Sequence, residues 1–305
     1  MEITPKPLVS ICLPIYSGEK FLEEALNSVI EQTYKSIELI VSDDNSLDNS
    51  LSIITQFKKR VDFPVLVFNH KPNGIGANWN NCVRNSNGKF IKFLFQDDIL
   101  ESTCIEKMVE QALKDDSIGL VYSKRKFLYD SKDLKSIEWI KNYENLHLSW
   151  KQNIVFDCKV TNGRKLLKDN NLLKFPLNKI GEPTAVLIKK EVFEKIGFFS
   201  EVLKQDLDVE FWYRSMKFFN VLFIDEALLS FRLHNDQATA KNSKTRLDES
   251  SLFLNSLYKN LFWQLFKTNQ KKLFFEFNPF GKALKIIINL AKRIKRKMKK
   301  LFFIF

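Results

Sequence analysis

Two adjacent aspartates, Asp97 and Asp98, follow the apolar run at 89–95 after Gln96 and are the residues best suited to hold a metal ion. Hard cations such as Mg²⁺ and Mn²⁺ prefer oxygen ligands, and one or two carboxylates suffice when phosphate and water supply the rest. Asp98 is therefore a candidate metal ligand. A helix N-cap is the alternative, because aspartate commonly precedes the first turn of a helix.

A second aspartate pair, Asp43 and Asp44, ends the apolar run at 37–41. Its carboxylates could accept hydrogen bonds from a nucleobase or from a ribose hydroxyl. A helix cap at Asn45 or Ser46 would explain the same polar cluster without any ligand. Both interpretations stay open from these residues alone.

Three further segments could contribute to the same chemistry. The turn at 73–80, Asn-Gly-Ile-Gly-Ala-Asn-Trp-Asn, could form a nest of backbone N–H groups for a polar ligand or be a plain tight turn. His234 follows a predicted strand and could contact a diphosphate or the metal, although a lone histidine is usually structural. Asp206, Asp208 and Glu210 open a predicted helix, whose dipole they complement. One of these acids could instead be a general base.

The elements that must position these residues alternate along the chain between strands and helices. This order predicts an α/β fold, a doubly wound, mostly parallel and Rossmann-like sheet built from right-handed βαβ units. Ligands of such sheets bind at the carboxyl ends of the strands, where both aspartate pairs lie. The predicted strands cover 8–15, 37–41, 64–68, 89–95, 118–129, 184–188, 221–224 and 228–233, and the predicted helices cover 19–32, 48–60, 102–114, 190–196 and 207–219.

The net charge of +12 on 305 residues first suggests a nucleic-acid partner. Nine Lys or Arg residues and no acid lie within 282–300, however, which leaves only +3 on residues 1–281. The positive excess is therefore a property of the tail, and we expect no nucleic-acid partner.

The four cysteines are far apart, with no C-x-x-C spacing, and no basic stretch followed by an apolar one opens the chain. These features predict a cytoplasmic protein without a disulfide framework. No apolar stretch reaches the roughly 18 to 20 residues that span a bilayer, so we expect no transmembrane helix.

Together these segments resemble the family 2 glycosyltransferases, whose fold is called GT-A. The resemblance covers roughly residues 8–240, and it is carried by the order and spacing of short motifs that are each weak alone. The matching motifs are Val9–Tyr16, Ser28–Tyr34, Val41–Ser46, Asn78–Asn80, Phe95–Asp98, Gly197–Glu201 and Asp208–Arg214.

The resemblance implies transfer of a sugar from a nucleotide-diphosphate sugar to a hydroxyl acceptor, with inversion, in bacterial cell-surface polysaccharide or glycoconjugate synthesis. The acceptor would be a glycan or a lipid-linked molecule, and the cofactor a divalent metal, Mn²⁺ or Mg²⁺. The implied donor-binding residues are Pro14, Tyr16, Asp43, Asp44, Asn78 and Asp97, and the implied metal ligand is Asp98, with His234 as a second candidate.

The general base of the family lies in a Glu-Asp motif, which reads Leu207-Asp208 here. Asp208 is aligned to the base, and Asp206 is the alternative if the register differs by two residues. The base would deprotonate the acceptor hydroxyl, which typically contributes about 10² to 10⁴ in rate.

Two other function classes are weighed against this one. A nucleotidyltransferase or nucleotide-sugar pyrophosphorylase should carry a Gly-rich and basic loop after its first strand, whereas residues 16–19 supply no cation. A non-enzymatic nucleic-acid-binding module should spread its basic residues over the whole chain.

The sequence predicts a catalytic domain at 1–240 and a helical C-terminal extension at 241–305. After Gly281 the apolar residues recur at steps of three and four and are flanked by Lys and Arg, which is typical of a basic amphipathic helix on an anionic membrane. We therefore expect attachment to the inner face of the cell membrane; packing on the protein itself or on a partner is the alternative. The apolar stripe consists of Leu284, Ile287, Ile288, Ala291, Ile294, Met298, Leu301, Phe302 and Phe305.

Overall fold

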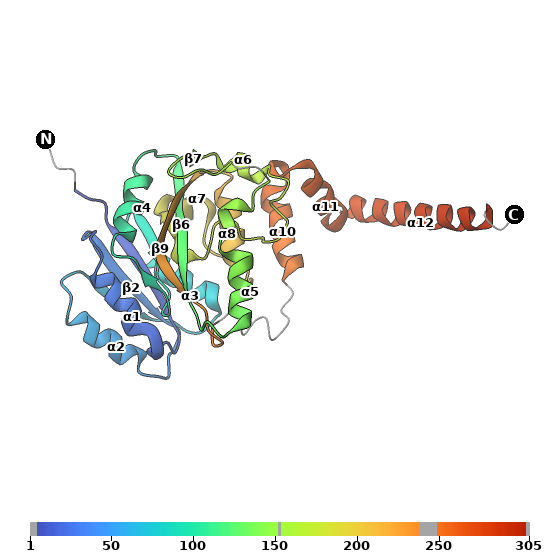
Figure 1. Ribbon diagram of the computed structural model, residues 1–305. Coiled ribbons are helices and arrows are strands. Elements are labelled where there is room, and N and C mark those ends of the chain that lie inside the picture. The colour runs from blue at the N-terminus through green and yellow to red at the C-terminus, as the bar shows by residue number, and fades with distance from the viewer. Residues whose placement is uncertain (1–4, 152–153, 238–248, 303–305) are drawn as a thin grey trace.

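The computed structural model describes residues 5–151, 154–237 and 249–302, with side chains up to residue 295. Its centre is a nine-stranded sheet in the order β3-β2-β1-β4-β8-β6-β9-β5, with β7 paired to β9 (Figure 1). The strands are β1 (Val9–Ile15), β2 (Ile37–Asp43), β3 (Val65–Asn69), β4 (Phe90–Phe93), β5 (Ile99–Leu100), β6 (Ile118–Leu128), β7 (Val160–Thr161), β8 (Val186–Lys189) and β9 (Asn220–Arg232).

Helices connect and cover these strands, which confirms the predicted α/β fold class with a helical C-terminal region. The α-helices are α1 (Glu19–Ile30), α2 (Ser50–Lys58), α3 (Ile75–Arg84), α4 (Cys104–Ala112), α5 (Leu134–Tyr143), α6 (Gly163–Leu167), α7 (Lys190–Ile196), α8 (Leu207–Ser215), α10 (Ser250–Leu261), α11 (Lys267–Phe277) and α12 (Pro279–Phe302). The 3₁₀ turns are η1 (Leu146–Leu148), η2 (Pro183–Ala185) and η3 (Phe262–Gln264).

The first half of the sheet is parallel, in the order β3-β2-β1-β4. Every residue of β1 and β2 is buried, as expected for strands with covered faces on both sides. Because neighbouring parallel strands end at one edge, the loops after β1, β2 and β4 meet there.

The second half is mixed, because β8 lies antiparallel between β4 and β6. β9 is one strand, whereas the sequence predicts two strands separated near Asp225 and Glu226. The register of β9 against β6 shifts at this point, so the two acids stay within the strand and face solvent. There they form ion pairs with Lys124 and Lys107.

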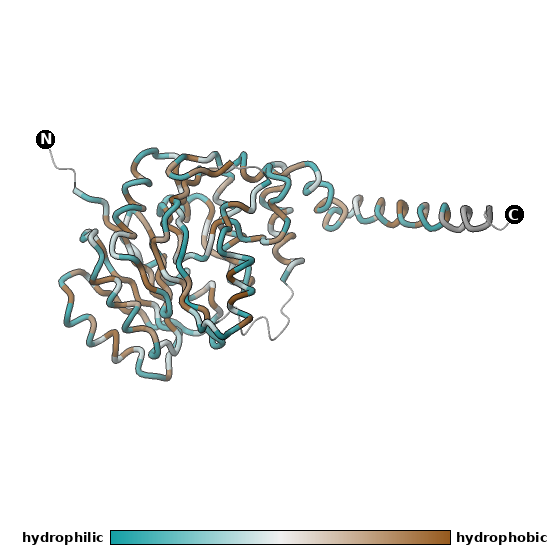
Figure 2. Tube along the Cα trace, in the orientation of Figure 1, coloured by the Kyte–Doolittle hydropathy of each residue, from teal (hydrophilic) through white to brown (hydrophobic). Residues whose placement is uncertain are grey.

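The C-terminal helices leave the body stepwise. α10 and α11 contribute Phe253, Leu257, Leu261 and Leu273 to the same apolar core as the sheet. α12 extends away from the body as a single rod (Figure 1), along which hydrophobic and hydrophilic residues alternate (Figure 2). Within the described ranges, no helix combines the length and apolarity that crossing a bilayer requires.

Candidate active site

A cavity of about 680 Å³ opens at the edge where β1, β2 and β4 end. Its wall is completed by η2, by the first turn of α8 and by the segment that follows β9. The cavity thus gathers loops that are far apart in the sequence. Of the predicted site residues, it brings together Pro14, Tyr16, Asp44, Asn78, Asp97, Asp208 and His234.

The loop after β1 presents Tyr16 at the cavity mouth, where its side chain is 57% exposed. Gln96 fixes the backbone of this loop. Its Oε1 accepts from the Tyr16 N–H at 2.9 Å, and its Nε2 donates to the Tyr16 carbonyl at 3.2 Å. An exposed ring on a fixed backbone can stack on a planar base. Gln96 was not among the predicted residues, although its place beside Asp97 is a signal for it.

The two aspartates after β2 have different surroundings. Asp44 lines the cavity, and its Oδ1 lies 2.8 Å from Nδ1 of His70. Asp43 is 2% exposed and does not line the cavity, because both of its oxygens accept from the N–H of Ser46, at 3.3 and 3.2 Å. Asp44 is therefore the aspartate of this pair that a ligand in the cavity can reach, and Asp43 stabilises the turn after β2.

The turn at 73–80 becomes the start of α3, which contributes Ile75, Asn78 and Trp79 to the cavity. The Asn78 Nδ2 donates to the Ile15 carbonyl at 3.4 Å. Its Oδ1 is buried and accepts no hydrogen bond within the described part of the chain. This oxygen is a ready acceptor for a ligand donor, since an unpaired buried acceptor is costly.

Asp98 does not reach the cavity. Its side chain is 1% exposed, with Oδ2 accepting from the Thr184 hydroxyl at 2.7 Å and Oδ1 accepting from the Arg232 N–H at 3.1 Å. Burial, and next the charge of Asp97, raise the pKa of Asp98 well above its usual range. Asp98, the expected metal ligand, therefore lies buried where the segment after β4 meets η2 and β9.

The carboxylate that does face the cavity at this strand end belongs to Asp97. Its Oδ2 lies 2.9 Å from Nε2 of His234, and both side chains are 20% exposed. The Arg232 Nε donates to the Asp97 carbonyl at 2.9 Å, which ties this turn to the end of β9. The structure thus places Asp97, rather than Asp98, beside the predicted second ligand His234.

Asp208 lies in the first turn of α8, is 8% exposed and lines the cavity. Its Oδ2 accepts from the Asn178 Nδ2 at 3.1 Å, and its Oδ1 accepts from the Val209 N–H at 2.7 Å. Burial raises the pKa of Asp208 well above its usual range, and the charges of Glu182 and Asp206 add to this. Asp206, the alternative base, does not line the cavity.

Glu182 is a cavity carboxylate that the sequence analysis missed. It precedes η2, and its Oε2 lies 2.9 Å from Nε of the buried Arg125. An acid between Gly181 and Pro183, directly before a predicted strand, is the signal that could have found it. The cavity therefore holds a second acid close to the base candidate.

Residues 10–197 match the model of glycosyl transferase family 2. The chain belongs to this family. An uncharacterized protein of Mycobacterium tuberculosis is 30% identical over 242 residues, which cover 79% of this chain and 70% of that protein. An uncharacterized glycosyltransferase of Rickettsia typhi is 27% identical over 259 residues, which cover 85% of this chain and 74% of that protein.

Two solved structures show the same fold. A fragment of S. aureus TarS in complex with UDP has a TM-score of 0.56 at 16% identity, covering 88% of this chain and 70% of that one. The mannosyltransferase PcManGT of Pyrobaculum calidifontis, in complex with GDP-Man and Mn²⁺, has a TM-score of 0.54 at 14% identity, covering 84% and 64%. The family and the GT-A fold favour a glycosyltransferase over a nucleotidyltransferase or a nucleic-acid-binding module.

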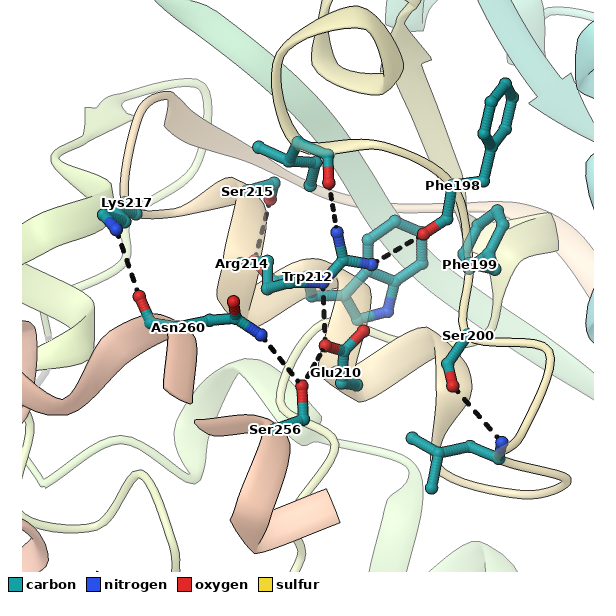
Figure 3. Close-up of polar contacts among 12 residues, drawn as sticks. Phe198, Phe199, Ser200, Glu210, Trp212, Arg214, Ser215, Lys217, Ser256 and Asn260 are labelled. Atoms are coloured by element: carbon teal, nitrogen blue, oxygen red, sulfur yellow. Dashed lines mark hydrogen bonds and ion pairs between the residues drawn. The ribbon is translucent and has the colours of Figure 1, made fainter. Parts of the chain in front are cut away.

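A buried network holds the glycosyltransferase's α8 in place (Figure 3). Arg214 donates from Nε to Glu210 at 2.7 Å and from its two terminal nitrogens to the carbonyls of Ile196 and Phe198. The Ser256 hydroxyl of α10 donates to the same Glu210 oxygen at 2.6 Å. Glu210 is thus a structural acid, which leaves Asp208 as the acid of this helix that faces the cavity.

The glycosyltransferase has no group of three or more His, Cys, Asp or Glu side chains that could hold a metal ion, as far as the described residues extend. Asp97 and His234 form a two-residue donor set on the cavity wall. Carboxylate is a suitable ligand for Mn²⁺, and neutral imidazole is the commonest metal ligand in proteins. A cation here would need further ligands from a diphosphate and from water.

Proposed function

We propose that this glycosyltransferase transfers a sugar from a nucleotide-diphosphate sugar to a hydroxyl acceptor, with inversion at the anomeric carbon. One observation carries the proposal. A single cavity is lined by an exposed aromatic ring at Tyr16, by the Asp97–His234 pair and by the buried carboxylate of Asp208. These are the parts that base binding, diphosphate binding and acceptor deprotonation require.

The donor would lie with its nucleoside near Tyr16 and Asp44. Tyr16 offers a face for the base, and the Asp44 carboxylate can accept from a base N–H or a ribose hydroxyl. The fold neighbours support this class of donor, because TarS has been crystallised with UDP and with UDP-GlcNAc, and PcManGT forms a complex with GDP-Man.

Asp97 and His234 would hold a divalent metal ion, Mn²⁺ or Mg²⁺, beside the diphosphate. When bound, the metal stabilises the negative charge that develops on the leaving diphosphate. PcManGT supports a metal requirement, because it forms a complex with GDP-Man and Mn²⁺. Asp98 would keep Asp97 in position through its hydrogen bonds to Thr184 and Arg232.

Asp208 would act as the base. Its ionised carboxylate takes the proton of the acceptor hydroxyl while the hydroxyl oxygen bonds to the anomeric carbon. The bond from that carbon to the diphosphate oxygen breaks on the opposite side, which inverts the anomeric centre. Burial raises the pKa of Asp208, and the ionised form of such a carboxyl is a better proton acceptor than an ordinary aspartate.

The acceptor would be a glycan or a lipid-linked molecule of the bacterial cell surface, reached from the cytoplasmic face of the membrane. α12 supports this location. Leu284, Ile287 and Ile294 are 45%, 61% and 59% exposed, and no acid interrupts the basic residues around them. Apolar residues uncovered beside Lys and Arg suit the interface of an anionic membrane.

The test is a screen of nucleotide-sugars, with and without Mn²⁺, for thermal stabilisation and for release of nucleoside diphosphate. We expect one donor to stabilise the enzyme only with the metal present. Formation of a nucleoside triphosphate from the nucleotide-sugar and pyrophosphate would contradict the proposed reaction.

A further inference from the structure

A second groove lies outside the active site, between α10, η3 and α11, with a volume of about 720 Å³. Three exposed lysines, Lys259, Lys267 and Lys271, line it, and none of its lining residues is acidic. No acid pairs with these lysines in the part of the chain that the structure describes. The groove is therefore suited to an anion.

Aromatic side chains form most of the remaining lining, together with the amides of Gln270 and Asn278. Trp263 is 80% exposed, and its ring meets that of Phe262 edge to face with centroids 5.0 Å apart. Phe274 lines the groove from α11. The groove thus combines lysines, which attract a negative charge, with aromatic rings, which pack on hydrocarbon. A ligand that uses both carries an anionic group on an apolar chain.

The groove is continuous with α12. Asn278 lines it and directly precedes α12, whose first turn exposes 83% of Phe280. In Figure 1 the end of α10, α11 and the start of α12 form one corner of the molecule. Exposed Trp beside Lys is the composition found where proteins meet the membrane–water interface.

We propose that this groove binds the phosphate headgroup of an anionic phospholipid, with the three lysines around the phosphate and Trp263 among the headgroups. The proposal rests on the membrane attachment proposed for α12. It adds a defined lipid site on the folded body, which would fix the orientation of the enzyme on the surface.

Tryptophan emission tests which surface meets the lipid. Three of the five tryptophans, Trp79, Trp150 and Trp212, are at most 6% exposed, and Trp139 is partly buried, so Trp263 is the one open to quenching. Full-length protein is mixed with phosphatidylcholine vesicles that contain brominated phosphatidylglycerol. We expect quenching, and we expect Trp263→Phe to remove most of it. Vesicle binding without quenching would overturn the groove and leave the attachment through α12 standing.

A charge variant tests the lysines. The triple change Lys259→Gln, Lys267→Gln and Lys271→Gln should weaken binding to phosphatidylglycerol vesicles about tenfold or more. The matched control changes Lys58, Lys59 and Lys89 to Gln, which removes the same charge from exposed positions elsewhere. Equal weakening by both variants would show a net-charge effect and overturn the site.

Two further measurements complete the test. Donor binding and transfer to a soluble acceptor should be the same in the triple-lysine variant and in wild type. If wild type itself shows no transfer, that result contradicts the proposed function and says nothing about the lipid site. Light scattering gives the oligomeric state. If wild type is a dimer and the triple-lysine variant is a monomer, the groove binds a second copy of the chain, and the lipid site is overturned.

Discussion

Asp97 and Asp98 are neighbours in the chain and have opposite surroundings. The first lines the cavity beside His234, and the second is buried under Thr184 and Arg232. The pair lies in the turn between β4 and β5, where the Asp98 N–H donates to the Phe95 carbonyl at 3.1 Å, and only Asp97 lines the cavity. The metal role that we propose for Asp97 rests on this difference, which adjacency in the sequence does not reveal.

Exchanging each aspartate for asparagine separates the two roles. Asp97→Asn should abolish Mn²⁺-dependent donor binding and transfer, because an amide is a much weaker metal ligand than a carboxylate. Asp98→Asn should keep both, since an asparagine there can donate to the Thr184 hydroxyl and accept from the Arg232 N–H. The cost in stability should be at most about 1–2 kcal/mol. Calorimetric titration with donor and Mn²⁺ decides, and the opposite pattern would return the metal to Asp98.

Asp208→Asn should lower kcat by about 10² or more while donor and metal binding stay close to wild type. Glu182→Gln is the comparison, because Glu182 lines the same cavity but is engaged with Arg125. We expect a smaller loss of kcat for that variant. Steady-state kinetics at saturating donor compares the two values of kcat. A larger loss of kcat with Glu182→Gln than with Asp208→Asn would make Glu182 the base candidate in place of Asp208.

The raised pKa of Asp208 has two consequences for pH. The base must be ionised, so kcat should rise with pH through that raised pKa. The folded state also holds the Asp208 proton more tightly than the unfolded state does, so stability falls as pH rises between the usual aspartate pKa and the raised one. The melting temperature of Asp208→Asn relative to wild type should therefore increase from pH 4 to pH 8. A constant difference would show that the pKa is not raised.

Pro14 and Tyr16 line the cavity because the first lies at the carboxyl end of β1 and the second follows it, and the place of β1 is set by the parallel strand order. Asp43 does not line the cavity, because both of its oxygens accept from the N–H of Ser46, three residues further along. Glu182 was not predicted, for a different reason. Whether a carboxylate faces a cavity depends on partners far away in the sequence, such as Arg125 for Glu182, which a single sequence does not reveal.

At the scale of elements, α8 carries the base candidate, and the segment just before α8 is bound by a residue from the C-terminal part of the chain. Glu249, the residue before α10, accepts through both oxygens from the N–H of Lys204 at 2.8 Å and from the N–H of Gln205 at 3.0 Å. Lys204 and Gln205 line the cavity. α10 therefore supports the active-site wall as well as the core.

Removing this support should weaken donor binding before it unfolds the protein. Glu249→Ala leaves two backbone donors without their acceptor beside the cavity, and we expect roughly tenfold lower donor affinity. Ser256→Ala is the control on the same helix, because it loses the bond to Glu210 away from the cavity. It should lower the free energy of unfolding by about 1.5–3 kcal/mol without changing donor affinity. Equal donor affinities in the two variants would contradict the role of Glu249.

The sequence predicted most element types and missed connections that depend on the sheet. The antiparallel course of β8 has no local signal, because an apolar run reads alike in both directions. The sequence predicted two strands where β9 is one, because Asp225 and Glu226 interrupt the apolar pattern. The shift of register between β6 and β9 that accommodates these two acids has no signal in the sequence. These features are set by pairing with distant strands.

At the scale of the whole molecule, α12 leaves the body at one end, next to α11 (Figure 1). The groove is lined by residues at the base of α12, and the candidate active-site cavity by loops of the sheet. Deleting residues 280–305 should reduce binding to anionic vesicles strongly and leave transfer to a soluble acceptor intact. Wild type should not bind neutral vesicles. Vesicle sedimentation checks this, and equal binding of the deletion variant and the full chain would refute attachment through α12. Residues 303–305, and the side chains from 296 onward that include Met298 and Leu301, lie outside the described part of the structure.

The antiparallel placement of β8 also bears on how the chain is made. β8 lies in the middle of the sheet, yet it is translated after both of its neighbours, β4 and β6. In a nascent chain that already contains β4 and β6, the β4 edge of the parallel half-sheet stays open and β6 lacks both of its partners, β8 and β9, until residues 186–189 leave the ribosome. Open strand edges are the surfaces through which chains aggregate. We therefore expect slow translation or premature termination before residue 186 to favour aggregation over folding.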